Sequence, residues 1–182
     1  QLGADLSTWG KLVSEHFAPE IPSTKRFVVF DTCALMDKPN LLSSLHAGDV
    51  PVVPHRVLQE LDGLKTGVAS LATGGTFSAD EPDAAESTRA KSRAAIRSVE
   101  SAGMSVRFEP EALELLPPEW DDGPDNRILS VAKRLALSRL LLVTSDRNLR
   151  NKAMAEGIDA TGPDQYLSGM TSGSTVSRRG AT

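Results

Sequence analysis

The chain has 182 residues, of which 40% are hydrophobic and 24% are charged, and its formal net charge is -4. This length can bury one substantial core rather than two, and no apolar run approaches the roughly 20 residues that span a bilayer. The single cysteine, Cys33, excludes an intramolecular disulfide, and the sequence shows no signal-peptide pattern. We therefore expect one compact domain in a reducing, cytoplasmic compartment, with no membrane partner.

The acidic balance alone argues against a nucleic-acid partner, because binding to phosphate requires Lys and Arg. The distribution of charge matters more than the sum, however. If four acids gather at a metal site, the rest of the chain is close to neutral, and local basic stripes can still hold a phosphate backbone. The net charge therefore leaves nucleic-acid binding open.

Residues 1–24 show one amphipathic pattern, which prolines at positions 19 and 22 end. Its apolar positions fall at helical spacing: Leu6, Trp9, Leu12, Val13 and Phe17. The pattern predicts a short helix in an N-terminal extension that packs on the main domain.

From residue 27 onward, strand and helix signals alternate. In chain order they predict a strand at 27–30, helix at 38–46, strand at 50–53, helix at 54–64, helix at 84–102 stopped by Gly103, strand at 104–108, helix at 124–138, strand at 140–144, helix at 146–156 and short strand at 158–160. Repeated β-α-β units imply parallel strands with helices on both faces. The predicted fold is therefore a three-layer α/β/α arrangement around a central, mostly parallel sheet of about five strands.

We place this domain at residues 25–167, with one segment of different composition inside it and another after it. Residues 66–83 are small, polar and glycine-bearing, which predicts a mobile loop. Residues 168–182 are rich in Ser, Thr and Gly, which predicts a flexible C-terminal tail.

Two of the apolar runs end in an aspartate. Asp31 directly follows residues 27–30, and Asp146 directly follows residues 140–145. Because ligands of open parallel sheets bind in the crevice at the carboxyl ends of the strands, both carboxylates are expected at one shared site.

Glu60 and Asp125 fall on helices that can face the same end of the sheet, one after the second strand and one before the fourth. Carboxylates that are brought together repel one another, so a cluster of four indicates a compensating divalent cation. Ligands that are all oxygen suit Mg²⁺ or Mn²⁺ rather than zinc.

Each acid taken alone also has a structural explanation. Asp125 and Asp146 stand at helix starts and could be N-caps, and Glu60 could be a solvated helix charge. Asp31 is harder to explain in this way, because it directly follows four apolar strand residues. The prediction of a metal site therefore rests on the four acids occurring together.

The segments around these acids resemble the motifs of PIN-domain ribonucleases, over roughly residues 26–167. The matching segments are FVVFDTCALM at 27–36, VVPHRVLQELDGLK at 52–65, DNRIL at 125–129 and VTSDRNLR at 143–150. The LDGLK and DNRIL stretches look more like PIN domains fused to PhoH-type ATPases, or those of RNA-decay endonucleases, than like small VapC-type toxins. No Walker A motif occurs in the chain, so an ATPase or antitoxin partner would lie outside it.

The resemblance implies Mg²⁺- or Mn²⁺-dependent cleavage of single-stranded RNA. By motif position, the catalytic and metal-binding residues would be Asp31, Glu60, Asp125 and Asp146. Thr144 or Ser145 would be a neighbouring hydroxyl. One or two ions would activate water, and a second ion or Lys65 would assist the leaving oxygen.

One position departs from the family pattern. Cys33 stands where the family usually has Asn or Ser after Asp-Thr, and a thiol is a poor ligand for a hard cation. We interpret Cys33 as a small buried hydrophobe.

Substrate contacts are predicted from basic residues. Arg89, Arg93 and Arg97 recur every four residues and share one helix face, which is either a solvated surface or a phosphate-binding stripe. Arg147 follows an acidic motif near the expected metal. Aromatic residues make up 4% of the chain, so extensive base stacking is not expected.

The predicted function is a metal-dependent endoribonuclease, and the sequence leaves open whether the chain forms a homo-oligomer. The alternative is a catalytically inactive PIN scaffold that binds RNA or a partner protein. A third reading, a receiver-like or phosphatase-like domain with Asp31 as phosphoacceptor, lacks the adjacent Asp pair or Asp-x-Asp that this chemistry generally uses.

Overall fold

The structure is a computed structural model that describes residues 25–66 and 82–169. The predicted N-terminal helix, most of the predicted loop at 66–83 and most of the predicted tail at 168–182 lie outside these ranges. No helix within them combines the length and the apolar character needed to cross a membrane.

Five parallel strands form one sheet in the described part of the chain, in the order β3-β2-β1-β4-β5. Their bounds are β1 Arg26–Phe30, β2 Asp49–Pro54, β3 Arg107–Glu109, β4 Leu140–Val143 and β5 Ala160–Thr161. Val28 of the central strand pairs in register with Pro51 on one side and with Leu141 on the other. The strands therefore end at one common edge, which is where β1 leads into Asp31.

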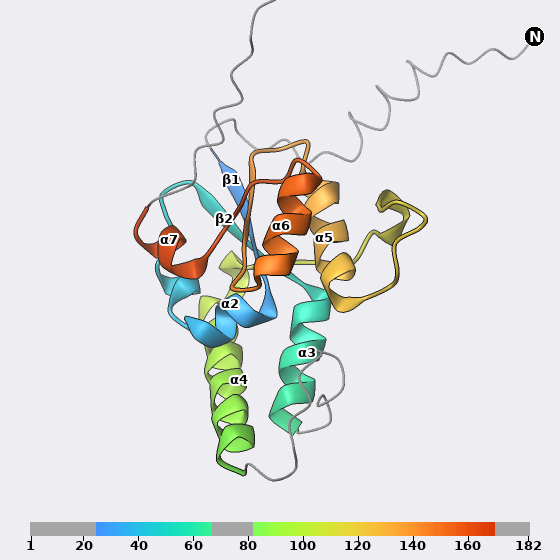
Figure 1. The fold of residues 1–182 in the computed structure, drawn as a ribbon. Coiled ribbons are helices and arrows are strands. Elements are labelled where there is room, and N and C mark those ends of the chain that lie inside the picture. Colours follow the sequence, from blue (N-terminus) through green and yellow to red (C-terminus); the bar gives the residue numbers. More distant parts are fainter. Residues whose placement is uncertain (1–24, 67–81, 170–182) are drawn as a thin grey trace, which may run out of the picture.

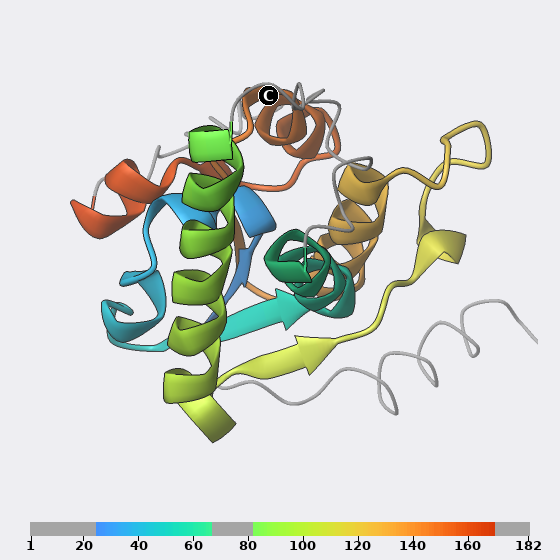
Figure 2. The same ribbon diagram turned by 90° about the horizontal axis from the view of Figure 1, so that it is seen from below.

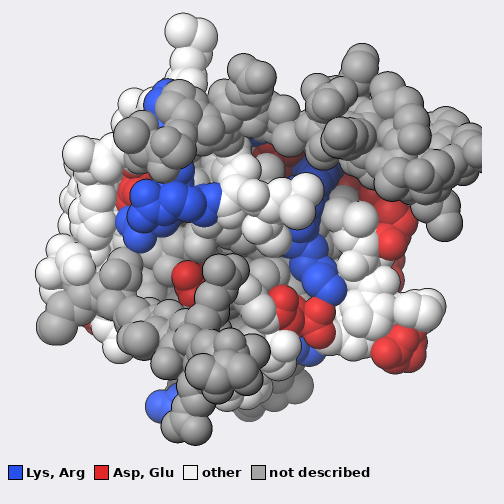
Figure 3. Space-filling model, turned by 90° about the horizontal axis from the view of Figure 1, so that it is seen from above, with Lys and Arg blue, Asp and Glu red and all other residues white. Residues whose placement is uncertain are grey.

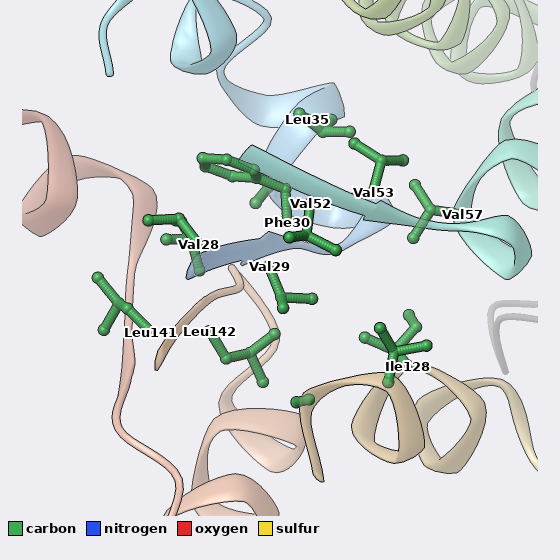
Figure 4. Close-up of a cluster of buried hydrophobic side chains, with 14 of the residues drawn as sticks. Val28, Val29, Phe30, Leu35, Val52, Val53, Val57, Ile128, Leu141 and Leu142 are labelled. Carbon is green, nitrogen blue, oxygen red and sulfur yellow. The ribbon is translucent and has the colours of Figure 1, made fainter. Parts of the chain in front are cut away.

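The helices lie on both faces of this sheet (Figures 1 and 2). Their bounds are α2 Thr32–Asp37, α3 His55–Thr66, α4 Pro82–Ala102, α5 Pro124–Leu135, α6 Arg147–Ala155 and α7 Pro163–Leu167, with short 3-10 turns at Leu41–Ser43, Gly103–Ser105 and Leu113–Leu115. One side of β1 is covered by Leu35 and Val53. On the other side, the side chain of Val29 packs with Leu142 and Ile128 (Figure 4). This arrangement confirms the predicted three-layer α/β/α fold.

The first helix differs from its prediction at 38–46. The chain instead turns helical at Thr32, because the side chain of Asp31 caps α2 by accepting the Ala34 N–H. The helix then ends at Asp37, since Pro39 disfavours helical geometry at the preceding residue. Only the 3-10 turn at Leu41–Ser43 remains within the predicted range.

The third strand is shorter than its prediction at 104–108 and lies further along the chain. Gly103 stops α4 as predicted, with a φ of 54° that disfavours other residues. A 3-10 turn then occupies Gly103–Ser105, so pairing with β2 begins only at Arg107. The helix α7 was not predicted.

A partly buried polar cluster attaches α7 to the beginnings of β1 and β2. The carboxylate of Asp49 accepts hydrogen bonds from Arg26 at 2.9 and 2.8 Å and from the Tyr166 hydroxyl at 2.8 Å. The imidazole of His46 stacks on the Tyr166 ring, with centroids 4.6 Å apart. The cluster lies at the end of the sheet opposite to Asp31.

Tyr166→Phe should lower the free energy of unfolding by about 1–2 kcal/mol, because one acceptor site of a buried carboxylate loses its donor. Urea unfolding of the two proteins measures the difference. Equal midpoints and slopes would contradict a stabilising role for this hydrogen bond.

Candidate metal centre

The four predicted acids line one hollow of about 360 Å³ at the carboxyl ends of the strands. Asp31 follows β1, Glu60 lies in the second turn of α3, Asp125 lies in the first turn of α5, and Asp146 precedes α6. Figure 2 looks onto this end of the sheet, with α3 in teal and α5 in tan beside it. Four elements that are distant in sequence therefore bring the four predicted acids together.

Asp31 is the most deeply buried of these acids, with 2% of its surface exposed. Its Oδ1 accepts the Ala34 N–H at 2.7 Å, and its Oδ2 accepts the Thr144 hydroxyl at 2.5 Å. Burial raises the pKa of Asp31 to about 7, against the opposing effect of these two hydrogen bonds. The negative charges of Asp146 and Glu60 raise the pKa further.

The hydroxyl of Thr144 joins two of the acids. It donates to Asp31 and accepts the backbone N–H of Asp146 at 2.9 Å. Thr144 is fully buried, so this geometry is shielded from water. The neighbouring Ser145 Oγ is also buried, and no partner for it lies within the described residues. Of the two hydroxyls that the sequence proposed, Thr144 alone forms a hydrogen bond to an acid within the described part of the chain.

Glu60 is held by two partners. Its Oε2 accepts the hydroxyl of Thr32, and its Oε1 accepts Nε of Arg56 at 2.9 Å. The residue is 6% exposed, which is not consistent with a solvated helix charge. Thr32 and Arg56 therefore fix the direction in which this carboxylate faces.

The helix-cap explanation is right for Asp146 and wrong for Asp125. Oδ1 of Asp146 accepts the N–H groups of Asn148 and Leu149 at 2.6 and 3.1 Å, which caps α6. The cap of α5 is Gly123 instead, and Asp125 lies inside the first turn. Burial, and after it the charge of Asp146, raises the pKa of Asp125.

The potential ligand atoms of the hollow are carboxylate oxygens, which suit a hard divalent cation. The carboxylates of the hollow raise one another's pKa, which is the repulsion that a bound cation compensates. As placed, however, no three His, Cys, Asp or Glu side chains of the described residues are arranged to hold one ion. The oxygens of Asp31 and Glu60 face protein donors instead. Each carboxylate oxygen has two lone pairs, so these hydrogen bonds are compatible with ligation.

Cys33 is not the buried hydrophobe that the sequence predicted. It lies in the first turn of α2, faces the hollow rather than the core, and is exposed. Protein atoms nevertheless surround the thiol closely enough that desolvation, followed by the charge of Asp31, raises the pKa of Cys33 to about 12. Cys33 is therefore a neutral thiol beside the acids.

The lining residues of the hollow that sequence reasoning missed include Asp121, Asn126 and Lys152. Asn126 is adjacent to a predicted acid, but it is 2% exposed and its contact with Lys152 joins residues 26 positions apart. Lys152 lies six residues beyond Asp146, which is not a multiple of the helical repeat, so periodicity does not group the two.

The predicted substrate-binding residues lie outside this hollow. Lys65 lines a separate apolar hollow of about 770 Å³ beside α4. Arg89 and Arg93 both pair with Glu86, at 3.7 and 2.5 Å. Arg97 lines a further hollow of about 680 Å³ between α4 and the turn at Leu41–Ser43. Arg147, at the start of α6, is exposed.

Comparison with known proteins identifies the family. The model of the PIN domain family matches residues 28–163, and the chain belongs to this family, whose fold is generally a nuclease fold. Among solved structures, a PilT N-terminus domain protein from the archaeon Sulfolobus solfataricus is similar, with 19% identity and a TM-score of 0.48, over 80% of this chain and 94% of that one. No curated protein matches. The suggested closeness to PhoH-associated or RNA-decay PIN domains stays a prediction.

Proposed function

We propose that this protein is an endoribonuclease that cleaves single-stranded RNA with Mg²⁺ or Mn²⁺ as cofactor. The observation that carries the proposal is the convergence of Asp31, Glu60, Asp125 and Asp146 on one hollow, from four separate elements. Membership of the PIN family supports nuclease chemistry. The choice of RNA and of these two metals comes from the resemblance of the motifs.

In this proposal the four carboxylates hold the cation or cations. A bound divalent cation supplies the charge that polarises a phosphate and activates water. The protein's own contribution is orientation, because Thr144 fixes Asp31 relative to the start of α6, while Thr32 and Arg56 fix Glu60. These partners limit the side-chain rotation that would otherwise accompany metal binding.

The test is cleavage of a circular single-stranded RNA by the purified chain, with Mn²⁺, with Mg²⁺ and with EDTA. A circle has no ends, so its conversion to a linear product reports internal cleavage alone. We expect linear product with at least one metal and none with EDTA. Persistence of the circle under all metal conditions, in protein that is folded, would contradict the proposal.

A second candidate function is a scaffold that binds RNA or a partner protein without cleaving. It is favoured by one observation, that the acids as placed do not form a ligand shell for a metal among the described residues. Binding of the RNA circle without linear product would support the scaffold. Metal-dependent linear product would exclude it.

We further propose that Arg97 contributes to binding of the RNA backbone, since the arginines at 89 and 93 are already paired with Glu86. Arg97→Glu should make the slope of log affinity against log salt shallower by about 0.7, the value for one phosphate contact on a single strand. Fluorescence anisotropy of a labelled RNA at several salt concentrations measures the slope.

Arg139→Glu is the matched control, because Arg139 is exposed and lies directly before β4, at the end of the sheet opposite to the four acids. In the view onto that end, basic and acidic side chains are interspersed (Figure 3). If both variants change the slope equally, Arg97 has no special role and the effect is one of net charge.

A further inference from the structure

We propose that Lys152 is a phosphate-binding subsite at the edge of the acidic hollow, where it binds a backbone phosphate of single-stranded RNA. The identity of this ligand rests on the proposed function. Among the described residues that line the hollow, Lys152 is the only lysine or arginine, whereas five lining residues are acidic. An RNA strand that approaches this hollow therefore meets one positive charge on its wall.

Among the described residues, Lys152 forms no ion pair. Its Nζ donates to the amide oxygen of Asn126 at 2.8 Å and lies 5.2 Å from the centroid of the Trp120 ring. Both partners are uncharged. Within residues 25–66 and 82–169 no carboxylate forms a salt bridge with Lys152, whereas Lys133 on the neighbouring helix pairs directly with Glu156 at 2.5 Å. A lysine ammonium has three donors, so donors remain for a ligand.

The direction of Lys152 is set by a chain of contacts. Nδ2 of Asn126 donates to the backbone oxygen of Asp121 at 2.9 Å and also to its carboxylate. These two bonds leave the amide oxygen of Asn126 facing Lys152. Asn126 is 2% exposed, so water does not compete for this arrangement. A flexible side chain is thus held in place before any ligand arrives, which lowers the entropic cost of binding.

The position also suits the chemistry of a polyanion. Five carboxylates repel phosphate, and a lysine acts as a point charge that attracts it without demanding a planar, bidentate geometry. Lys152 lies on α6, which Asp146 caps, so the same helix carries a predicted metal ligand and this cation. We infer that Lys152 brings the backbone close to the acids, which makes it a substrate-contacting residue rather than only a counter-charge.

The test is binding of a labelled single-stranded RNA in EDTA, which excludes cleavage, by the full chain and by Lys152→Gln. Glutamine keeps a donor for Asn126 but removes the charge. We expect affinity to fall about 3- to 10-fold and the salt slope to become shallower by about 0.7. Lys152→Arg should restore the slope. Lys133→Gln is the matched control and should leave the slope unchanged.

Thermal unfolding of each variant accompanies the binding data. An unchanged slope in folded Lys152→Gln, or no RNA binding by the unmodified chain, overturns the subsite. Binding that depends on Lys152, without any cleavage once metal is added, overturns the endoribonuclease and retains the subsite. If the chain does cleave, Lys152→Gln should raise KM more than it lowers kcat, because the charge acts in binding.

Discussion

Asp31→Asn should reduce RNA cleavage on the order of 10²- to 10³-fold or more, while the protein stays folded. The loss is expected because Asp31 is the most deeply buried of the four acids and carries a charge that a divalent cation would need. The fold should persist, because the Asn side chain retains an oxygen that can accept the Ala34 N–H. The NH₂ group of the Asn side chain can in turn donate to the Thr144 hydroxyl. Initial rates on single-stranded RNA with Mn²⁺, measured beside circular dichroism, test both parts.

Asp37→Asn provides the matched control for this change. Asp37 ends the same short helix, α2, and is exposed, so its replacement removes an equal charge without touching the hollow. Its activity should stay within about twofold of the unmodified chain, since surface substitutions of this kind rarely matter. Near-normal cleavage by Asp31→Asn would remove this residue from the proposed site.

The stability of the metal-free protein should fall as pH rises, through Asp31. Its pKa is about 7 in the folded chain, against about 4 in an unfolded one. Between these values the folded state binds more protons than the unfolded state, so raising the pH favours unfolding. The destabilisation is absent below about pH 4 and complete above about pH 7. As the pH rises from about 5 to about 8, the free energy of unfolding should fall by roughly 2–3 kcal/mol through this one group.

Comparison with Asp31→Asn isolates this contribution, because other titrating groups are shared by the two proteins. Urea unfolding in EDTA should show the variant gaining stability relative to the unmodified chain as pH rises across this window. A relative stability that is independent of pH would show that Asp31 titrates normally in the folded state. Added Mn²⁺ should stabilise the unmodified chain at high pH, if the metal binds the folded state alone.

The sheet and the acids could be predicted from sequence because their signals are local. Apolar runs such as 27–30 mark buried parallel strands, and each aspartate follows its strand or begins its helix. The position of α2 could not be predicted in the same way. The side chain of Asp31 begins this helix by capping it, and the apolar pattern at 38–46 contained no sign of that hydrogen bond.

The remainder of the candidate site depends on contacts between distant residues. Asn126 and Lys152 are 26 positions apart and meet only when α5 and α6 pack side by side. Thr144 reaches Asp31 across 113 positions, and here the family resemblance supplied the expectation. Cys33 was misjudged because its exposure depends on where α2 starts, which the sequence had placed wrongly.

The central claim is that the four converging carboxylates bind a divalent cation, and direct titration of Mn²⁺ into the metal-free chain tests it. Calorimetry at about pH 7.5 should show saturable binding of one or two ions to the unmodified protein. Asp31→Asn should bind at least about tenfold more weakly, while Asp37→Asn should bind normally. No saturable binding to the folded, unmodified chain, or equal affinity in the chain and in Asp31→Asn, would contradict the claim.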